Sequence, residues 1–300
     1  MIESVFVRVL GDDTGIFGEQ LIKLRSPYAS GFNIRDIDGL GPVDSDLNMP
    51  ERSLDWGARV YGSRNRSRTI GFDIDFCDPI PGADVGAIRR RLYSLFPTGR
   101  QVGLTFTDET NFSSYTFGYV ESHTPNIFKE RANTNISVRC PDPYFYSGRE
   151  ITTVLTSASS GEEKPSFEFP YSNESLTADL TQFTKSSVPS ESSGMTIYYR
   201  GTAPAYAKVL VSGGGSVASN VEIRNTRNNT GFALKWNITS SVASDGRQRT
   251  REFTLPSFLD TNKPFSWVYL LPGTNTFKVS STNGANVYAS VTYTNAYLGV

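Results

Sequence analysis

The sequence predicts a mainly β protein of two domains with a single helix. Its 300 residues exceed the size at which one hydrophobic core keeps growing, so two domains of about 150 residues each are expected. The 19 Phe and 15 Tyr far outnumber the 3 Trp, a composition that favours strands and turns. Alternating apolar and polar segments recur along the chain, and only one segment has helical periodicity. We place the domains at 1–150 and 151–300.

The first half opens with short alternating segments. Val5, Val7 and Val9 share one face of a strand, and a second segment surrounds residues 21–24. Residues 31–50 are interrupted by glycines and prolines, which predicts a long loop, or two short strands joined by a loop. Loops of this length inside a compact domain are usually functional or cover a partner.

The clearest strand of the first half is residues 69–76, where apolar and polar side chains alternate with a period of two. Residues 102–108 and 115–122 predict a pair of strands around a turn at 108–111, and residues 135–140 add another strand.

The only convincing helix covers about residues 84–96. Its apolar residues recur at helical spacing, Asp84 can cap its start, and Pro97 ends it. Arg89, Arg90 and Arg91 lie between the apolar positions. They form either a solvated face or a contact with a neighbouring subunit.

The second half begins with a change in composition. From 151 to about 194 the chain is rich in Ser and Thr, and we place the domain junction near the start of this stretch. Many short strands separated by turn residues follow, with no helix, which predicts a β-sandwich of jelly-roll type. The predicted strands are 195–200, 206–212, 220–225, 232–238, 251–256, 265–270, 275–281 and 287–293.

Charge and cysteine content exclude several classes of protein. The formal net charge of −1 lacks the positive field that non-specific nucleic-acid binding requires. The amino terminus carries acids and an arginine where a signal peptide would be apolar. No segment approaches the ~20 apolar residues of a membrane span, so we expect synthesis in the cytoplasm and no membrane insertion. Cys77 and Cys140 are too few for a disulfide framework or zinc site, and are either buried free thiols or one bridge.

No catalytic, cofactor or metal site is evident. His123 is the only histidine, and we interpret it as a plain surface residue. The pairs of aspartates along the chain lack the spacing of a calcium loop. A glycan-cleaving enzyme needs two facing carboxylates, and no spacing points to such a pair. We therefore predict a binding or structural protein that is not an enzyme.

Four arginines gather in one predicted loop, at about residues 57–68: Arg59, Arg64, Arg66 and Arg68. They either neutralise acids on a neighbouring subunit or are solvated on a hairpin.

Aromatic side chains of the second domain offer an alternative function, a carbohydrate-binding adhesion module. Tyr198, Tyr199 and Trp236 are the candidate glycan contacts, and alternation places at least one of the two tyrosines outward. Core packing is the alternative fate of Trp236.

The segment VRCPDPYFY at residues 138–146 resembles the end of the first domain in the distal tail proteins of phages with long, non-contractile tails. Other segments agree in order: IDGLGP (37–42), LYSLFPTG (92–99), LPGTNTFKV (271–279) and the closing VTYTNAYLGV (291–300). The resemblance spans nearly the whole chain, except for the Ser-rich region from 152 to 194.

This resemblance implies a homo-hexameric ring in the virion, at the tail tip. The first domain would be a split-barrel-like belt, and the second a galectin-like β-sandwich that projects outward. The ring would join the tail tube protein to the tail-tip hub and receptor-binding proteins, leaving a channel for DNA. The lectin-like shape of the second domain does not by itself imply sugar binding, and a host-surface glycan is a partner only under the alternative function. No catalytic residue is implied. The candidate subunit contacts are Asp38, Leu40, Arg59, Tyr61, Arg64, Arg66 and Arg68.

Overall fold

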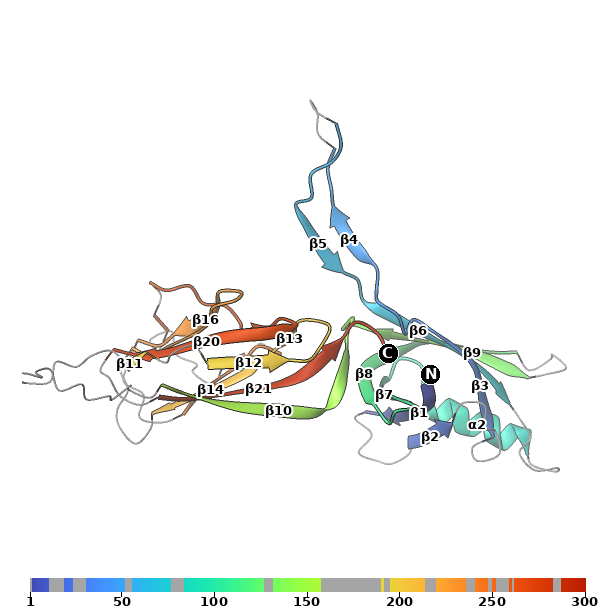
Figure 1. Cartoon of the computed structure of the whole chain (residues 1–300). Coiled ribbons are helices and arrows are strands. Elements are labelled where there is room, and N and C mark those ends of the chain that lie inside the picture. Colours follow the sequence, from blue (N-terminus) through green and yellow to red (C-terminus); the bar gives the residue numbers. More distant parts are fainter. Residues whose placement is uncertain are drawn as a thin grey trace, which may run out of the picture. The chain divides into compact units, whose positions relative to one another are not determined.

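The computed structural model describes most of the chain (Figure 1). The described residues are 2–10, 19–23, 31–51, 56–76, 84–126, 132–157, 190–191, 195–213, 220–235, 241–247, 250–251, 259–260, 262–282 and 287–300. Predictions on Cys77, on Trp236 and on most of the Ser-rich segment fall outside these residues.

The chain folds into two compact units. Unit 1 comprises Met1–Arg149 and Ala296–Val300, and unit 2 comprises Glu150–Asn295. The predicted boundary places the last five residues in the second domain, whereas the structure places them in unit 1. They belong to unit 1 because the Val300 N–H donates to the Leu40 carbonyl at 3.1 Å, and the Leu298 carbonyl accepts from Arg68 at 2.7 Å.

Unit 1 is built from one antiparallel strip of strands in the order β2-β1-β7-β8-β9-β6-β3. Its two end strands approach each other, so the strip curls towards closure. The strands of the strip are β1 (Ile2–Val9), β2 (Glu19–Lys23), β3 (Phe32–Asp38), β6 (Arg68–Phe76), β7 (Gln101–Asp108), β8 (Ser113–Asn126) and β9 (Asn133–Cys140). The region 31–50 thus contains two strands joined by a loop, the second of the two predicted arrangements.

The helix of unit 1 is α2, Val85–Leu95, in agreement with the prediction. Asp84 caps it by accepting a hydrogen bond from the Gly86 N–H at 2.8 Å. Leu92 and Leu95 are buried in the core, together with Phe96 and the inward residues of the strands. On β6, the alternation predicted from the sequence is confirmed: every second residue faces inward, and Phe72 lies 5.6 Å from the ring of Phe96.

Two further strands of unit 1 do not join the strip. β4 (Ser45–Asn48) and β5 (Gly62–Asn65) pair only with each other, in an antiparallel hairpin. Figure 1 shows this hairpin, in lighter blue, extending away from the other strands of the unit.

Unit 2 is a two-layered antiparallel β-sandwich, as predicted. One layer has the strand order β18-β17-β14-β21-β10. The other layer has the order β11-β20-β15-β16, and β12 also pairs with β20. Tyr199 of one layer packs edge-on against Tyr293 of the other, with ring centroids 5.7 Å apart. The first residues of β10, up to Arg149, and the last two of β21 belong to unit 1. The strands are β10 (Phe145–Ser157), β11 (Ser190–Glu191), β12 (Met195–Tyr199), β13 (Ala205–Tyr206), β14 (Lys208–Gly213), β15 (Glu222–Asn225), β16 (Thr230–Ala233), β17 (Val242–Asp245), β18 (Thr250–Arg251), β19 (Tyr269–Leu270), β20 (Gly273–Ser281) and β21 (Val287–Tyr297).

One predicted strand of unit 2 is much shorter than expected. Of residues 265–270, only Tyr269 and Leu270 form a strand, paired with β13. Ser266 instead makes two hydrogen bonds with Gly231. The Ser266 N–H donates to the Gly231 carbonyl at 2.9 Å, and the Gly231 N–H donates to the Ser266 hydroxyl at 3.0 Å. The segment therefore covers β16 and does not extend its sheet.

Candidate functional site: the exposed arm of unit 1

The most exposed part of unit 1 is the hairpin of β4 and β5 with its flanking residues, 44–51 and 56–66, which we call the arm. Backbone hydrogen bonds continue the pairing beyond the strands, from Arg66 to Asp44 at 3.0 Å and from Tyr61 to Asn48 at 2.9 Å. A further bridge joins Glu51 to Ala58. The first side of the arm, residues 44–51, spans roughly 25 Å at about 3.3 Å per residue.

Apolar side chains on the arm are unusually exposed. Trp56 is 97% exposed and Tyr61 is 64% exposed. An isolated two-stranded hairpin is only marginally stable in water, and clustered exposed apolar side chains usually mark an interaction surface. The remaining exposed apolar residues of the arm are Leu47, Met49 and Val60. The arm is therefore a surface that a partner would stabilise by covering it.

The predicted arginine cluster is divided by the structure. Arg66 pairs within the arm, its Nε lying 2.7 Å from an Asp46 carboxylate oxygen, and this hydrogen bond lowers the pKa of Asp46. The Arg59 guanidinium lies 5.3 Å from the centre of the Tyr61 ring. Arg64 is exposed and makes no ion pair in the described part of the chain. These three arginines lie on a hairpin. They remain predicted candidates for subunit contacts.

The prediction that Arg68 lies on an exposed loop and contacts a neighbouring subunit is wrong. It is the first residue of β6, and only 2% of its surface is exposed. A buried guanidinium cannot contact a neighbouring subunit directly, so Arg68 is removed from the candidate contacts.

The Arg68 guanidinium joins three segments at the base of the arm. It donates to the carbonyls of Gly39 and Gly41, to the Pro143 carbonyl at 2.8 and 3.0 Å, and to the Leu298 carbonyl at 2.7 Å. Its carbon centre lies 4.2 Å from the centre of the Phe145 ring, a cation–π contact. Burial lowers the pKa of Arg68, but arginine stays protonated in proteins. The charge is thus stabilised mainly by carbonyl dipoles and an aromatic face.

The segment that leads into the arm is also fixed in place. Gly39 has φ +82°, and a Cβ atom there would lie 2.0 Å from the Thr69 carbonyl oxygen, so only glycine fits. Of the neighbouring contact candidates, Asp38 is exposed, and Leu40 is half-buried against the core. On the opposite side, the Asn65 amide donates to the Tyr144 hydroxyl at 3.0 Å. The base of the arm is therefore anchored to the rest of unit 1.

A second exposed apolar surface of unit 1 was not identified from the sequence. Tyr115, Phe117 and Tyr119 alternate along β8 and point away from the core, and Phe117 and Tyr119 are exposed. Tyr115 packs against Phe117, with ring centroids 5.2 Å apart. The alternation of residues 115–122 carried this signal, because aromatic residues occupy the phase opposite to buried Val120.

The similarity of this chain to known proteins lies in its fold. No protein-family model matches the chain, and no curated protein matches it. Its structure is similar to the Dit protein of phage SPP1, described as a paradigm of the hub adsorption apparatus in phages that infect Gram-positive bacteria. The two share 15% identity and a TM-score of 0.61, over 97% of this chain and 98% of the other. A protein of the phage P2 baseplate, in its activated conformation with Ca, shares 9% identity and a TM-score of 0.43 over 97% and 98%.

The similarity to the SPP1 protein covers nearly all of both chains. It confirms the predicted fold, a mainly β chain, and the described residues contain one helix. At 15% sequence identity, the similarity shows a shared fold and nothing beyond it.

The glycan contacts predicted in unit 2 are only partly available. Tyr198 is 68% exposed, as alternation required of one of the two tyrosines, but Tyr199 is 1% exposed and donates from its hydroxyl to the Ala203 carbonyl at 2.8 Å. The prediction that Tyr199 contacts a glycan is therefore wrong, because its ring is part of the core.

Residues that could have carried chemistry are mostly buried or isolated. His123 is half-buried and lies against Tyr93, with ring centroids 4.9 Å apart, so it is not the plain surface residue that we expected. Cys140 is a buried free thiol, and burial raises its pKa to about 11. In the described ranges, no group of three or more His, Cys, Asp or Glu residues could hold a metal ion. No helix in the described part of the chain is long and apolar enough to cross a membrane.

Proposed function

We propose that this chain is a structural, non-enzymatic subunit of a phage tail tip, and that six copies form a ring with a central channel for DNA. In the virion, the ring would connect the tail tube protein to the hub and receptor-binding proteins of the tail tip. The proposal combines the fold shared with a phage hub protein with the motifs at 37–42 and 138–146.

The observation that carries the proposal is the arm. A hairpin with Trp56 97% exposed is a poor surface for an isolated molecule. In a head-to-tail ring, the arm of each subunit would lie on the next copy, and the interface would close by rotation. We propose that unit 1 of the next copy is the surface that receives it, because the exposed Phe117 and Tyr119 offer apolar area there.

The candidate contacts then have distinct roles. Trp56 and Tyr61 would supply the buried apolar area, since aromatic side chains dominate interface energies. Arg59 and Arg64 would pair with acids of the neighbour at the rim, where each charge contributes little affinity. Arg66 would contact the neighbouring subunit together with Asp46, with which it forms an ion pair.

The test is the mass of the full chain in solution, measured by light scattering after size exclusion and followed by negative-stain imaging. We expect six-fold rings with a central hole. Trp56→Ala should weaken each contact by roughly 2–4 kcal/mol, the range of an interface hot spot, and shift the protein towards smaller species.

A matched control is Tyr288→Ala, which removes an exposed aromatic side chain from unit 2. It should leave the mass unchanged. A wild-type chain that stays monomeric at every concentration, or an equal effect of the two substitutions, would contradict the proposal.

A further inference from the structure

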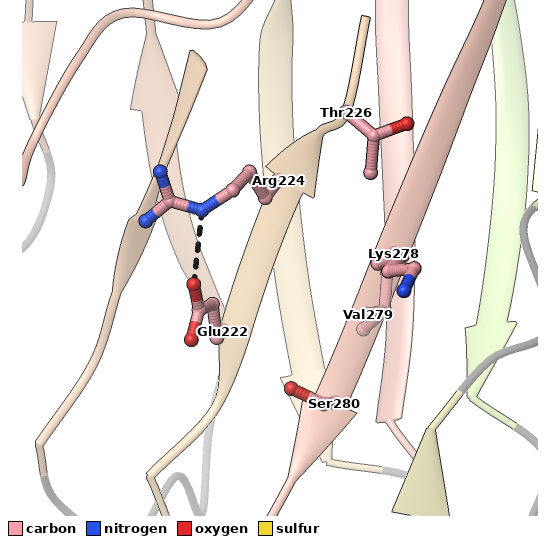
Figure 2. Close-up of a pocket in the computed structure, with 6 residues that line it drawn as sticks. All are labelled: Glu222, Arg224, Thr226, Lys278, Val279 and Ser280. Carbon is pink, nitrogen blue, oxygen red and sulfur yellow. Dashed lines mark hydrogen bonds and ion pairs between the residues drawn. The ribbon is translucent and has the colours of Figure 1, made fainter. Parts of the chain in front are cut away.

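Unit 2 contains a polar hollow on the outward face of its second sheet, between β15 and β20 (Figure 2). Its volume is about 210 Å³. It is lined by Glu222, Arg224, Thr226, Lys278, Val279 and Ser280.

Strand alternation places these side chains together. On β15, Ile223 and Asn225 point into the core, so the residues between them point outward. The pairing register sets Arg224 directly opposite Lys278 on β20, and Glu222 opposite Ser280. Like charges that face each other across two strands are destabilising. A pair of cations at this position therefore calls for a negative partner.

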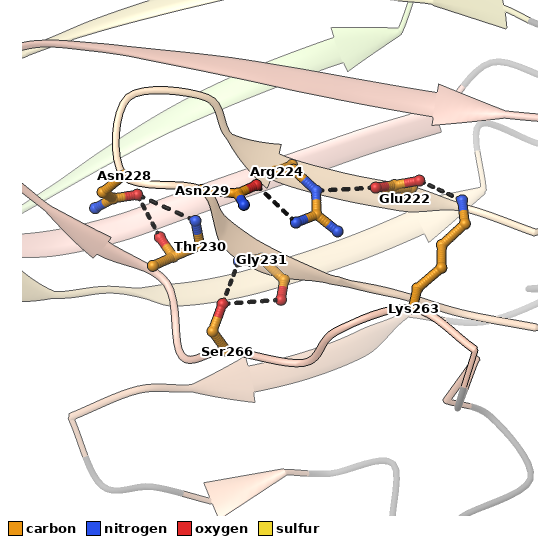
Figure 3. Close-up of polar contacts among 8 residues, drawn as sticks. All are labelled: Glu222, Arg224, Asn228, Asn229, Thr230, Gly231, Lys263 and Ser266. Carbon is orange, nitrogen blue, oxygen red and sulfur yellow. Dashed lines mark hydrogen bonds and ion pairs between the residues drawn. The ribbon is translucent and has the colours of Figure 1, made fainter.

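Among the described residues, Glu222 is the carboxylate that lines the hollow, and it is already paired. One oxygen of Glu222 accepts from the Arg224 Nε at 3.0 Å, and the other pairs with Lys263 (Figure 3). Burial alone would raise the pKa of Glu222, but the hydrogen bonds from Lys263 and Arg224 outweigh it, and the pKa lies below its usual value. Glu222 is thus ionised at neutral pH and neutralises one of three neighbouring cations. Among the side chains that the structure describes, the three cations therefore outnumber the carboxylate by two charges.

The Arg224 guanidinium is held in place from both sides. Beyond its bond to Glu222, it donates to the Asn229 side chain at 2.9 Å. The turn that carries Asn229 is fixed by Asn228, whose side chain accepts from the Thr230 hydroxyl at 2.6 Å and donates to the Tyr269 carbonyl at 2.8 Å. The cation is therefore preorganised. Lys278, in contrast, is exposed and makes no ion pair in the described part of the chain.

We propose that this hollow binds an anionic group, a phosphate or carboxylate, carried by a sugar or polyol chain. Arg224 and Lys278 supply the charge, and the Ser280 hydroxyl can donate to the anion. The Thr226 hydroxyl donates to the Thr276 carbonyl at 3.0 Å, so it can accept a hydrogen bond from a hydroxyl of the ligand. The volume is below the 300 Å³ or more of typical small-molecule pockets, so it suits one small unit of such a chain. None of the described residues that line the hollow is aromatic, so these residues offer no platform for stacking on a neutral pyranose.

The same face offers a continuation for a longer chain. Tyr198, 68% exposed, pairs with Thr274 on β20, four residues from Lys278 and thus about 13 Å away along the strand. Thr196 and Thr276, a facing pair, lie between them. This proposal differs from the aromatic glycan platform predicted from the sequence, because charge rather than stacking selects the ligand. It does not depend on the tail-tip role.

The test is calorimetric titration of the full chain, at low ionic strength, with sn-glycerol 3-phosphate, glucuronate and neutral galactose. We expect one of the two anions to bind in the millimolar range or tighter, and galactose to bind at least about tenfold more weakly. The better anion identifies the group. Its affinity should fall as salt is added, because screening weakens exposed charge pairs.

Lys278→Gln should reduce the affinity for the anion about tenfold or more, the loss of one charge-assisted hydrogen bond. Lys208→Gln, which removes an exposed cation from β14 in the other sheet, is the matched control and should change nothing. Both positions are exposed, and equal melting temperatures would confirm intact folding.

Four results would overturn the proposal. They are no binding of either anion, equal binding of galactose, an unchanged affinity in Lys278→Gln, and tighter binding of a short polyglutamate peptide that is also lost in this variant. The last result would assign the hollow to an acidic protein partner.

Discussion

Replacing Arg68 by methionine tests whether one buried cation holds the base of the arm together. Methionine keeps an unbranched apolar stem but removes every hydrogen bond of the guanidinium. The carbonyls of Gly39 and Gly41 belong to exposed residues and can bond to water instead. The carbonyls of Pro143 and Leu298 belong to half-buried residues, so most of the cost falls on them.

The magnitude follows from these partners. A hydrogen bond to a charged group contributes about 1.5–3 kcal/mol, and an unpaired buried carbonyl costs about 1–3 kcal/mol. Release of the buried charge offsets part of this loss. We therefore expect Arg68→Met to destabilise unit 1 by roughly 2–4 kcal/mol. Arg68→Lys should recover little, because an ammonium cannot reproduce the fork of donors.

Hydrogen exchange followed by mass spectrometry resolves the effect by unit. Peptides from β6 and β9 should lose protection by a factor of about 30 to 1,000, whereas peptides from β14 and β21 should not change. Arg64→Met is the control, since this exposed residue should shift stability by less than about 0.5 kcal/mol. Unchanged protection of β6 in Arg68→Met, or an equal loss in both units, would refute the reasoning.

Two further substitutions test local features of unit 1. Gly39→Ala should lower the melting temperature of unit 1, because φ is +82° and the added Cβ would lie 2.0 Å from the Thr69 carbonyl oxygen. The control is Gly41→Ala, whose Cβ meets nothing within 4 Å and which should leave the melting temperature unchanged. Equal melting temperatures of the two variants would contradict this. Burial lowers the pKa of His123 in the folded state, so the unfolded chain takes up a proton first as the pH falls below about 6.5, and stability should drop over that range. His123→Gln should lose this part of the pH dependence in thermal unfolding, and an identical pH profile would count against the assignment.

Periodicity predicts the buried face of β6, including the position of Arg68. Ile70, Phe72 and Ile74 were predicted to be buried and are buried. Arg68 lies in the same phase of the strand, so alternation alone placed it inside. Its charge suggested an exposed loop instead, because buried arginines are rare unless paired. The carbonyls that pair with it come from positions up to 230 residues away, which no local pattern reveals.

The arm shows a different limit of sequence reasoning. Both faces of β4 and most of β5 are exposed, so these strands have no buried face and no period of two to detect. Glycines and prolines marked residues 31–50 as irregular, but not as the start of a projecting hairpin. In unit 2, Tyr199 is in phase with buried Ile197, so alternation decided which of the two tyrosines is available. The hollow between β15 and β20 depends on strand register, which the sequence does not specify.

The most direct test of the ring proposal is a photo-crosslink from the tip of the arm. A benzoylphenylalanine placed at position 56 replaces one exposed aromatic side chain by another and leaves the base of the arm intact. After irradiation of the full chain, we expect covalent dimers and higher species, with the crosslinked peptide in unit 1 of a second copy. Crosslinks found only within one chain, or no covalent dimer at concentrations where rings are visible by electron microscopy, would contradict the claim that the arm joins neighbouring subunits.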